Sequence, residues 1–216
     1  ALFSENAEQN LDGARFDRLI SLVLQIRDME DEEEDADSEN ELDIAAEELS
    51  REETGSVSET SLYSDLYSRL KNRNLCIAMV ANAIGESALD PGIAGDCGDY
   101  ARSRSDKAIP IQGKGLCCSY GLWQYNICGG MGIDYLEANG NPSTNEEKLR
   151  ILSDYSKQVD YMVGYLQSRY SSVISENRSI QDFTEWFVRE IERPADPDGA
   201  AQKRIGYALD LDSRIV

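Results

Sequence analysis

Residues 75–84 read LCIAMVANAI and run directly into Gly85 and Glu86, and this stretch decides the fold. Apolar residues occupy nearly every face of a helix with this sequence, and such a helix is usually buried in the centre of a domain. The helix should end near Gly85 and Glu86, because Pro91 and Gly92 enforce a turn soon afterwards. The sequence therefore predicts a buried central helix that carries one carboxylate, Glu86, at its C-terminal end.

A second informative stretch, SYGLWQY, occupies residues 119–125. Gly121 permits a tight hairpin or the close approach of a ligand. The amide of Gln124 can hydrogen-bond a hydroxyl or acetamido group, and we expect it in a cleft. An aromatic residue such as Trp123 is more often part of a core than a sugar-stacking surface, although Tyr125 offers a second ring. The candidate substrate-binding residues of this hairpin are Ser119, Tyr120, Gln124 and Tyr125.

The pattern after residue 62 is otherwise mainly helical. Residues 146–170 place apolar side chains at helical spacing. Asp182 can cap a further helix that Pro194 stops, and Asp198 opens a last one. A small β element is expected around residues 110–127. The sequence thus predicts an α+β domain that is mainly α.

The charge of the chain is concentrated in its N-terminal third. The whole chain has a formal net charge of −20, and residues 1–66 contain 21 acidic residues against 4 arginines, a net of −17. The remainder therefore has a net charge of only −3. Such an acidic region repels phosphate backbones, so we expect no nucleic-acid partner. No apolar run reaches the roughly eighteen residues of a membrane span, so none is predicted.

This asymmetry divides the chain into an acidic N-terminal arm, residues 1–61, and a globular domain, residues 62–216. Within the arm, residues 16–26 form an apolar segment consistent with a helix, and the acidic run 31–35 follows it. This segment either docks onto another protein while the acidic part spans the gap, or packs back on the domain. We favour docking, because so much unbalanced charge fits poorly on a compact domain.

The chain contains no histidine. Its absence excludes Cys-His and Ser-His-Asp catalysis and most zinc hydrolase sites, so hydrolysis must depend chiefly on carboxylates. Cleavage of a glycosidic bond needs an acid that keeps its proton near neutral pH. Glu86 is placed for this role, since burial after an apolar helix and the dipole at the helix C-terminus both raise its pKa.

The Gly- and Asp-rich loop at residues 92–118 offers a second carboxylate. Asp96 and Asp99 are candidates for activating water or stabilising an oxocarbenium ion, although aspartates in such loops are more often turn residues. Glu192 can enter a cleft as well, but an ion pair with Arg204 at a helix end is the preferred interpretation.

The five cysteines cannot all be paired within one chain. One bridge between Cys97 and the Cys117-Cys118 pair is possible, and free or buried thiols are an equally good interpretation. The cysteines lack the paired spacing of zinc ligands. We expect neither a metal nor another cofactor.

These motifs resemble a known family. Glu86-Ser87 at the close of a buried helix, with GLWQ at 121–124 on a later hairpin, is similar to the lysozyme superfamily, including goose-type lysozymes and lytic transglycosylases. The Trp-Phe pair at 186–187, ERPADP at 192–197 and the later Arg204 resemble the tail-lysozyme domain of bacteriophages. In that family a Phe-Glu-x-Pro-like segment precedes a final helix containing an arginine. The resemblance covers roughly residues 62–212, and Ile191 departs from it where an aromatic residue is expected.

The resemblance implies a lysozyme-like fold and a virion-associated glycosidase that cleaves the β-1,4 bond between N-acetylmuramic acid and N-acetylglucosamine. Glu86 would be the general acid, and Gln124 would line the cleft. The enzyme would be located in the phage tail, with the arm bound to tail or baseplate proteins, and would open the host cell wall locally during infection. Two alternatives remain open: a structural tail protein with a degenerate lysozyme-like fold, and a lytic transglycosylase.

Overall fold

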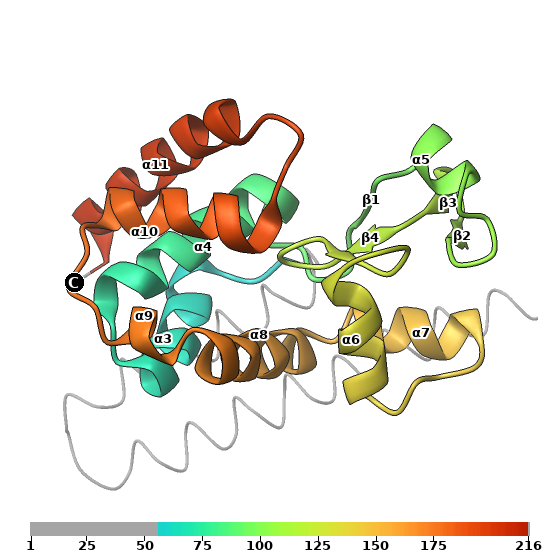
Figure 1. The fold of residues 1–216 in the computed structure, drawn as a ribbon, viewed down its shortest axis with the longest axis horizontal. Helices are drawn as coiled ribbons and strands as arrows, with labels where there is room; N and C mark the ends of the chain where they lie inside the picture. Colours follow the sequence, from blue (N-terminus) through green and yellow to red (C-terminus); the bar gives the residue numbers. More distant parts are fainter. Residues whose placement is uncertain (1–55, 216) are drawn as a thin grey trace, which may run out of the picture. The chain divides into compact units, whose positions relative to one another are not determined.

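The computed structural model describes residues 56–215, which form a mainly helical domain with two small antiparallel sheets (Figure 1). The predicted fold class is confirmed. The helices are α3 (Glu59–Leu70), α4 (Arg73–Ser87), α5 (Asp99–Arg102), α6 (Met131–Ala138), α7 (Asn145–Leu152), α8 (Tyr155–Arg169), α9 (Ser171–Ile174), α10 (Ile180–Phe187), the π-helix η1 (Val188–Glu192) and α11 (Pro197–Arg214). The strands are β1 (Ala94–Gly95), β2 (Ile109–Ile111), β3 (Gly115–Cys117), β4 (Ser119–Tyr120) and β5 (Tyr125–Asn126).

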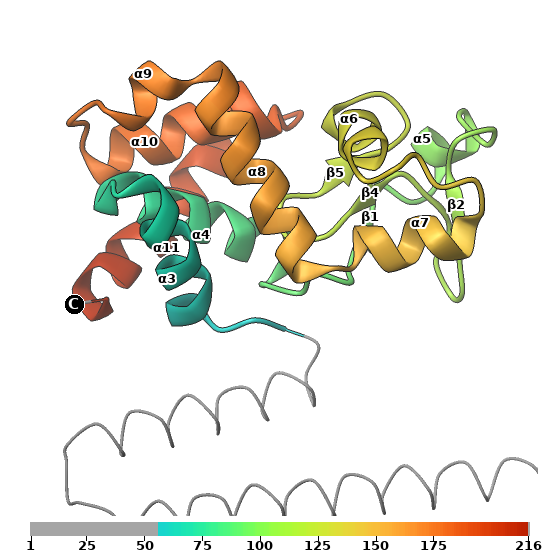
Figure 2. The ribbon, with the colours of Figure 1, turned by 90° about the horizontal axis from the view of Figure 1, so that it is seen from below.

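Helix α4 is the central element, as its composition predicts. All residues from 75 to 83 are buried, and α4 packs against α3, α10 and α11. The side chain of Asn72 caps its first turn by accepting a hydrogen bond from Leu75 N. Its C-terminal end points toward the strands in both views (Figures 1 and 2). The apolar helix therefore holds its last turn, with Glu86, between the helical part and the β part of the domain.

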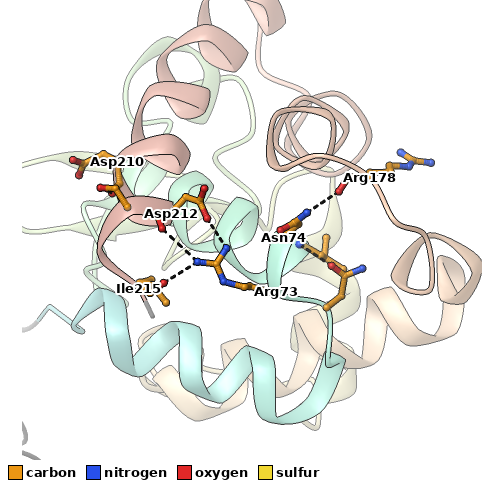
Figure 3. Close-up of polar contacts among 9 residues, drawn as sticks. Arg73, Asn74, Arg178, Asp210, Asp212 and Ile215 are labelled. Atoms are coloured by element: carbon orange, nitrogen blue, oxygen red, sulfur yellow. Dashed lines mark hydrogen bonds and ion pairs between the residues drawn. The ribbon is translucent and has the colours of Figure 1, made fainter.

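Polar contacts at the other end of α4 fix its position against the C-terminal helices (Figure 3). Arg73 forms an ion pair with Asp212 and donates a hydrogen bond of 2.8 Å to the carbonyl oxygen of Ile215. Asn74 donates a hydrogen bond of 2.9 Å to the carbonyl oxygen of Arg178, just before α10. These bonds set the register of α10 and α11 along α4, and α11 carries Arg204 toward the opposite end.

The β part consists of one sheet in the order β1-β4-β5 and a separate β2-β3 hairpin. Two disulfides brace it: Cys97–Cys117 and Cys118–Cys128. Among the described residues Cys76 is a free cysteine, and it is buried in α4. Of the two interpretations left open by the sequence, the bridge from Cys97 is present, and a second bridge accompanies it. By the chain-entropy argument, loops closed over 20 and 10 residues contribute about 3 kcal/mol each.

The turn between β4 and β5 is the glycine-hinged hairpin that the sequence predicts. Gly121 has φ +79°, and a Cβ atom there would lie 2.4 Å from Oε1 of Gln158. The same oxygen accepts a hydrogen bond of 2.7 Å from Leu122 N. The indole of Trp123 donates to the carbonyl oxygen of Met79 in α4, at 3.1 Å, and the side chain is buried. The hairpin is therefore anchored to α4 and α8 by buried hydrogen bonds.

Three helix boundaries differ from the predicted ones. The apolar pattern over residues 146–170 belongs to two helices, α7 and α8, because Asp154 caps a new helix by accepting from Lys157 N. Ser179, rather than Asp182, caps α10, and Asp182 lies in its first turn. Likewise Asp196, rather than Asp198, caps α11 by accepting from Gly199 N. In each case a short polar side chain satisfies a free backbone N–H, and the apolar pattern does not reveal which of the nearby polar residues does so.

The described domain begins before residue 62. Val57 is buried and donates a backbone hydrogen bond of 2.8 Å to Leu89, and Ser58 caps α3. The predicted boundary between residues 61 and 62 thus falls inside α3. The rest of the predicted arm, with its docking segment 16–26, lies outside the described residues. No helix of the described part has the length and apolar character needed to cross a membrane.

Candidate active site

Glu86 lies in the last turn of α4, where the sequence predicts it. The helix ends at Ser87 and is capped by Ala88, which adopts the left-handed conformation with φ 51°. The side chain of Glu86 is 21% exposed, so it is neither free in solvent nor sealed in the core. Its carboxylate forms an ion pair with the guanidinium of Arg204 from α11. A partly buried carboxyl with one open side is the arrangement that a general acid requires.

The approach of Arg204 to α4 depends on Gly85. A Cβ atom at this position would lie 2.8 Å from Nε of Arg204, so any larger residue would collide with the guanidinium. Glycine inside a helix costs roughly 0.5–1 kcal/mol relative to alanine. Its presence next to Glu86 is therefore explained by the space that the arginine needs. The sequence contains this signal, since Gly85 is the only glycine between residues 59 and 91.

Arg204 also binds the second carboxyl of the site. Its Nη2 lies 3.3 Å from Oε2 of Glu192, the last residue of η1. The side chain of Arg204 is 7% exposed and that of Glu192 is 3% exposed. The structure thus shows the expected ion pair of Glu192 with Arg204, and it also brings Glu86 to the same guanidinium. We call these three residues the Glu–Arg–Glu cluster.

The pKa values of both carboxyls are raised, with burial as the largest cause. Burial raises the pKa of Glu86; Arg204 and a hydrogen bond with Glu192 lower it, and the charge of Asp96 raises it. Burial also raises the pKa of Glu192 well above its ordinary value, against the lowering effect of Arg204 and with a further increase from Glu86. Burial outweighs the neighbouring arginine in both cases, so the two groups retain protons more strongly than free glutamates.

Asp96 is the acidic residue that the β part brings toward Glu86. It follows β1 with φ +49°, and the hydroxyl of Ser119 donates to its carboxylate. Asn126 Nδ2 donates to Oδ2 of Asp96 at 3.3 Å and to the hydroxyl of Tyr100 at 3.2 Å. Ser119 is itself buried, so its observed role is to hold Asp96.

Asp99, the other predicted carboxylate, has a different position. Its side chain is 96% exposed at the start of α5 and pairs with Arg102 in the same helix. The structure does not bring it into the Glu–Arg–Glu cluster, because α5 turns its first residue toward solvent. Of the two candidates, Asp96 alone fits a site that includes Glu86.

The tyrosines of the hairpin are core residues. Tyr120 and Tyr125 are 2% and 1% exposed. Their hydroxyls donate to backbone carbonyl oxygens, that of Cys117 at 3.0 Å and that of Gln158 at 2.9 Å. Tyr125 stacks on Tyr135 of α6, and the hydroxyl of Tyr120 stays within the β part. Burial leaves both rings little surface for a sugar; Tyr125 nevertheless lies among the residues that line the cavity described below, and the contact of these rings with a sugar stays a prediction. Trp123 is likewise buried, which agrees with its interpretation as a core aromatic.

Gln124 is partly buried at the end of the turn, with φ +48°, and its Nε2 donates to the carbonyl oxygen of Gly121 at 3.0 Å. It lines a cavity of about 310 Å³ between the hairpin, α6, α8 and η1. Other residues that line the cavity include Trp123, Tyr125, Asn126, Met131, Tyr165, Glu190 and Glu192. Of the Glu–Arg–Glu cluster, Glu192 borders the same cavity as the predicted cleft residue Gln124.

Sequence reasoning missed the direct contact of Arg204 with Glu86, and it missed Asn126 and Tyr165 altogether. Arg204 stood out in the C-terminal motif, but nothing in the linear order indicates that it reaches a residue 118 positions earlier. Among residues 56–215, no group of three or more His, Cys, Asp or Glu side chains could hold a metal ion. The charged groups of the Glu–Arg–Glu cluster are two carboxyls and one guanidinium.

A mainly helical domain whose buried central helix ends in a partly buried glutamate, facing a small antiparallel sheet, defines a lysozyme-like protein. The comparison with protein families agrees. The sequence model of the phage tail lysozyme family matches residues 57–211, and the chain belongs to this family. Membership supports a peptidoglycan-degrading, lysozyme-like function and a place in the phage tail. No curated protein and no solved structure matched the chain.

Proposed function

We propose that this protein cleaves the β-1,4 bond between N-acetylmuramic acid and N-acetylglucosamine in peptidoglycan, with Glu86 as the general acid. The observation that carries the proposal is the state of Glu86: a carboxyl at the end of the central helix, 21% exposed, with a pKa raised by burial. Such a group keeps a proton at pH values where an ordinary glutamate has lost it, and it can still reach a glycosidic oxygen.

Asp96 is the proposed second carboxylate. Ser119 and Asn126 both donate to it, which fixes its orientation on the β side of the site. Its charge already acts on Glu86, since it contributes to the raised pKa of that group. In this position Asp96 would activate the attacking water or stabilise the oxocarbenium ion.

The cavity next to Glu192 is the proposed sugar-binding site. It carries the amide side chains of Gln124 and Asn126 and the phenol of Tyr165, which suit the hydroxyl and acetamido groups of amino sugars. Ser119, Tyr120 and Tyr125 support this wall from within: Ser119 holds Asp96, and the two tyrosines pack the hairpin against the core.

We further propose that the protein acts from the virion tail on the envelope of the host, opening the cell wall locally, and that the acidic arm binds a tail or baseplate protein. The proposal rests on the family and on the net charge of −17 in residues 1–66. A truncation that tests it should begin at residue 56, since Val57 and Ser58 belong to the fold. This truncated protein should cleave peptidoglycan but fail to enter particles. Loss of cleavage by a folded truncation would contradict the separation of roles.

The test of the proposed reaction is lysis of purified peptidoglycan by the wild type and by Glu86→Gln, which keeps the shape and removes the proton. General acid catalysis contributes about 10²–10⁴-fold, so a loss of that size is expected. The matched control is Glu146→Gln, an exposed glutamate in the first turn of α7, which should retain full activity. Unchanged activity of Glu86→Gln would refute the assignment. An inactive wild type would instead support a structural tail protein.

Mass spectrometry of the released muropeptides distinguishes the two chemistries. Reducing ends mean hydrolysis, with Asp96 as the partner of Glu86. Ends with a 1,6-anhydro ring mean that the sugar's own hydroxyl attacks, and then Glu86 serves as both acid and base. If the reaction is transglycosylation, Asp96→Asn should keep most of the activity. If it is hydrolysis, Asp96→Asn should lose most of it.

A further inference from the structure

The Glu–Arg–Glu cluster contains a carboxyl, Glu192, that the proposed reaction does not use. We propose that Glu192 is a positioning residue that shares one proton with Glu86 across Arg204, so that the pair, rather than Glu86 alone, supplies the acid. The inference rests on the proposed function, because it concerns how Glu86 acquires and keeps its proton.

The geometry of Glu192 requires a proton or a donor. Its side chain is 3% exposed, and neither of its carboxylate oxygens accepts a hydrogen bond. A buried carboxylate without donors is costly, and the ion pair with Arg204 at 3.3 Å is shared with Glu86. A protonated Glu192 that donates its hydrogen bond to Glu86 removes this cost. The pair then has the arrangement of two coupled acids that bind one proton between them.

The net charge of the cluster also favours one bound proton for the two carboxyls. With both carboxyls ionised, the three residues have a net charge of −1 in a nearly water-free place. With one proton on the pair, the net charge is zero, which is the state that burial favours. With two protons, Arg204 would be buried without a counter-ion. One proton per cluster is therefore the resting state that the structure favours.

The division of exposure assigns the roles. Glu86, at 21% exposed, is the most open group of the cluster and is the one proposed to touch the leaving oxygen; Glu192 borders the cavity but is only 3% exposed, and Arg204 is 7% exposed. When Glu86 protonates the leaving oxygen, its own carboxylate is left beside Arg204. Because the pair held a single proton, both carboxyls are then ionised, and Arg204 is the counter-ion that they share. Water that attacks the sugar gives its hydroxyl to carbon and its proton back to the pair, so each cycle ends with one proton on the cluster.

The charged groups that act on Glu86 come from three elements: Arg204 from α11, Glu192 from η1, and Asp96 next to β1. In Glu192→Gln the amide can still donate a hydrogen bond to Glu86, and Arg204 still favours its ionised form, but the second carboxylate, whose charge opposes loss of the shared proton, is gone. The acid would therefore be lost at lower pH. Without the second carboxyl, the enzyme should therefore work only under more acidic conditions.

The experiment is the pH profile of kcat/KM for soluble peptidoglycan fragments, measured on the full chain as wild type, Glu192→Gln and Glu192→Asp. The wild type should lose activity as pH rises through the upper pKa of the pair. In Glu192→Gln this alkaline limb of the pH profile should move to lower pH by at least one unit. At pH values on that limb, kcat/KM should then fall about tenfold, with KM little changed. Glu192→Asp keeps a carboxyl and should restore most of the profile.

The matched control is Glu185→Gln, an exposed glutamate that pairs with Arg189 in the neighbouring turn. It should reproduce the wild-type profile. If Glu192 has only a structural role, Glu192→Gln should change the melting temperature and leave the limb in place, and this result would overturn the inference while the proposed function stands. Full activity of Glu86→Gln would overturn both.

A second measurement does not depend on activity or on the folding of Glu192→Gln. Carbon-13 NMR of the glutamate carboxyls should show Glu192 titrating at an elevated pH in the wild type. In Glu86→Gln its titration should move to lower pH, because the neighbouring negative charge is gone. An unmoved titration of Glu192 would show that the two carboxyls are independent, and it would overturn the shared proton.

Discussion

Gln158 offers the sharpest test of how the helical part holds the hairpin. It lies in α8 and is fully buried, and its amide bonds three backbone groups from separate segments. Its Oε1 accepts from Leu122 N at 2.7 Å, and its Nε2 donates to Pro91 O at 2.8 Å and Leu152 O at 2.6 Å. The substitution Gln158→Leu keeps the helix propensity and approximate size but removes all three bonds.

The cost follows from the groups left behind. A buried backbone group without a partner costs about 1–3 kcal/mol, so three of them should lower the free energy of unfolding by about 3–9 kcal/mol. This is a large part of the roughly 5–15 kcal/mol that stabilises a whole domain. For a domain of this size, at about 2–4 °C per kcal/mol, the melting temperature should fall by about 6–36 °C.

Thermal unfolding followed by circular dichroism measures this change. Gln167→Leu is the matched control, because it makes the same substitution at an exposed position of α8 and should change the stability by no more than about 0.5 kcal/mol. A Gln158→Leu protein that melts within about 3 °C of the control would refute the reasoning, since by the size scaling it would put the three bonds at about 1 kcal/mol together.

Two further predictions concern stability. Because burial raises the pKa of Glu192, the native state binds its proton more tightly than the unfolded chain, and stability should fall as pH rises above the ordinary glutamate pKa of about 4.3. Between pH 4 and pH 8, the melting temperature of Glu192→Gln should fall less than that of the wild type. Equal falls would contradict the raised pKa of the buried Glu192 carboxyl. Reduction of the Cys97–Cys117 and Cys118–Cys128 bridges should remove up to about 6 kcal/mol by loop entropy and abolish lysis, since both bridges flank the residues that hold Asp96. Melting with and without dithiothreitol, with thiols counted, checks this, and undiminished lysis by the fully reduced protein would contradict it.

The sequence predicted which helix and turn carry the site residues better than it predicted the residues that contact them. The apolar run at residues 75–84 required a buried helix, and Gly121 required a sharp turn, so Glu86 and Gln124 followed from local rules. Asp96 and Asp99 looked alike in one loop, because nothing in the linear order distinguishes an inward from an outward aspartate. The backbone with φ +49° at Asp96 and its donors from other strands made that distinction.

By itself, the sequence determined the mainly helical class, the central helix and the hairpin, because periodicity and glycine placement are local facts. The absence of histidine directed the proposed chemistry to carboxylates. Only the tertiary structure decided that Arg204 passes over Gly85 to join Glu86 to Glu192, which cysteines pair, and which hairpin aromatics lie in the core. These outcomes depend on contacts between residues up to 118 positions apart. Such contacts are set by the packing of α10 and α11 on α4, and the order of residues along the chain does not encode them pair by pair.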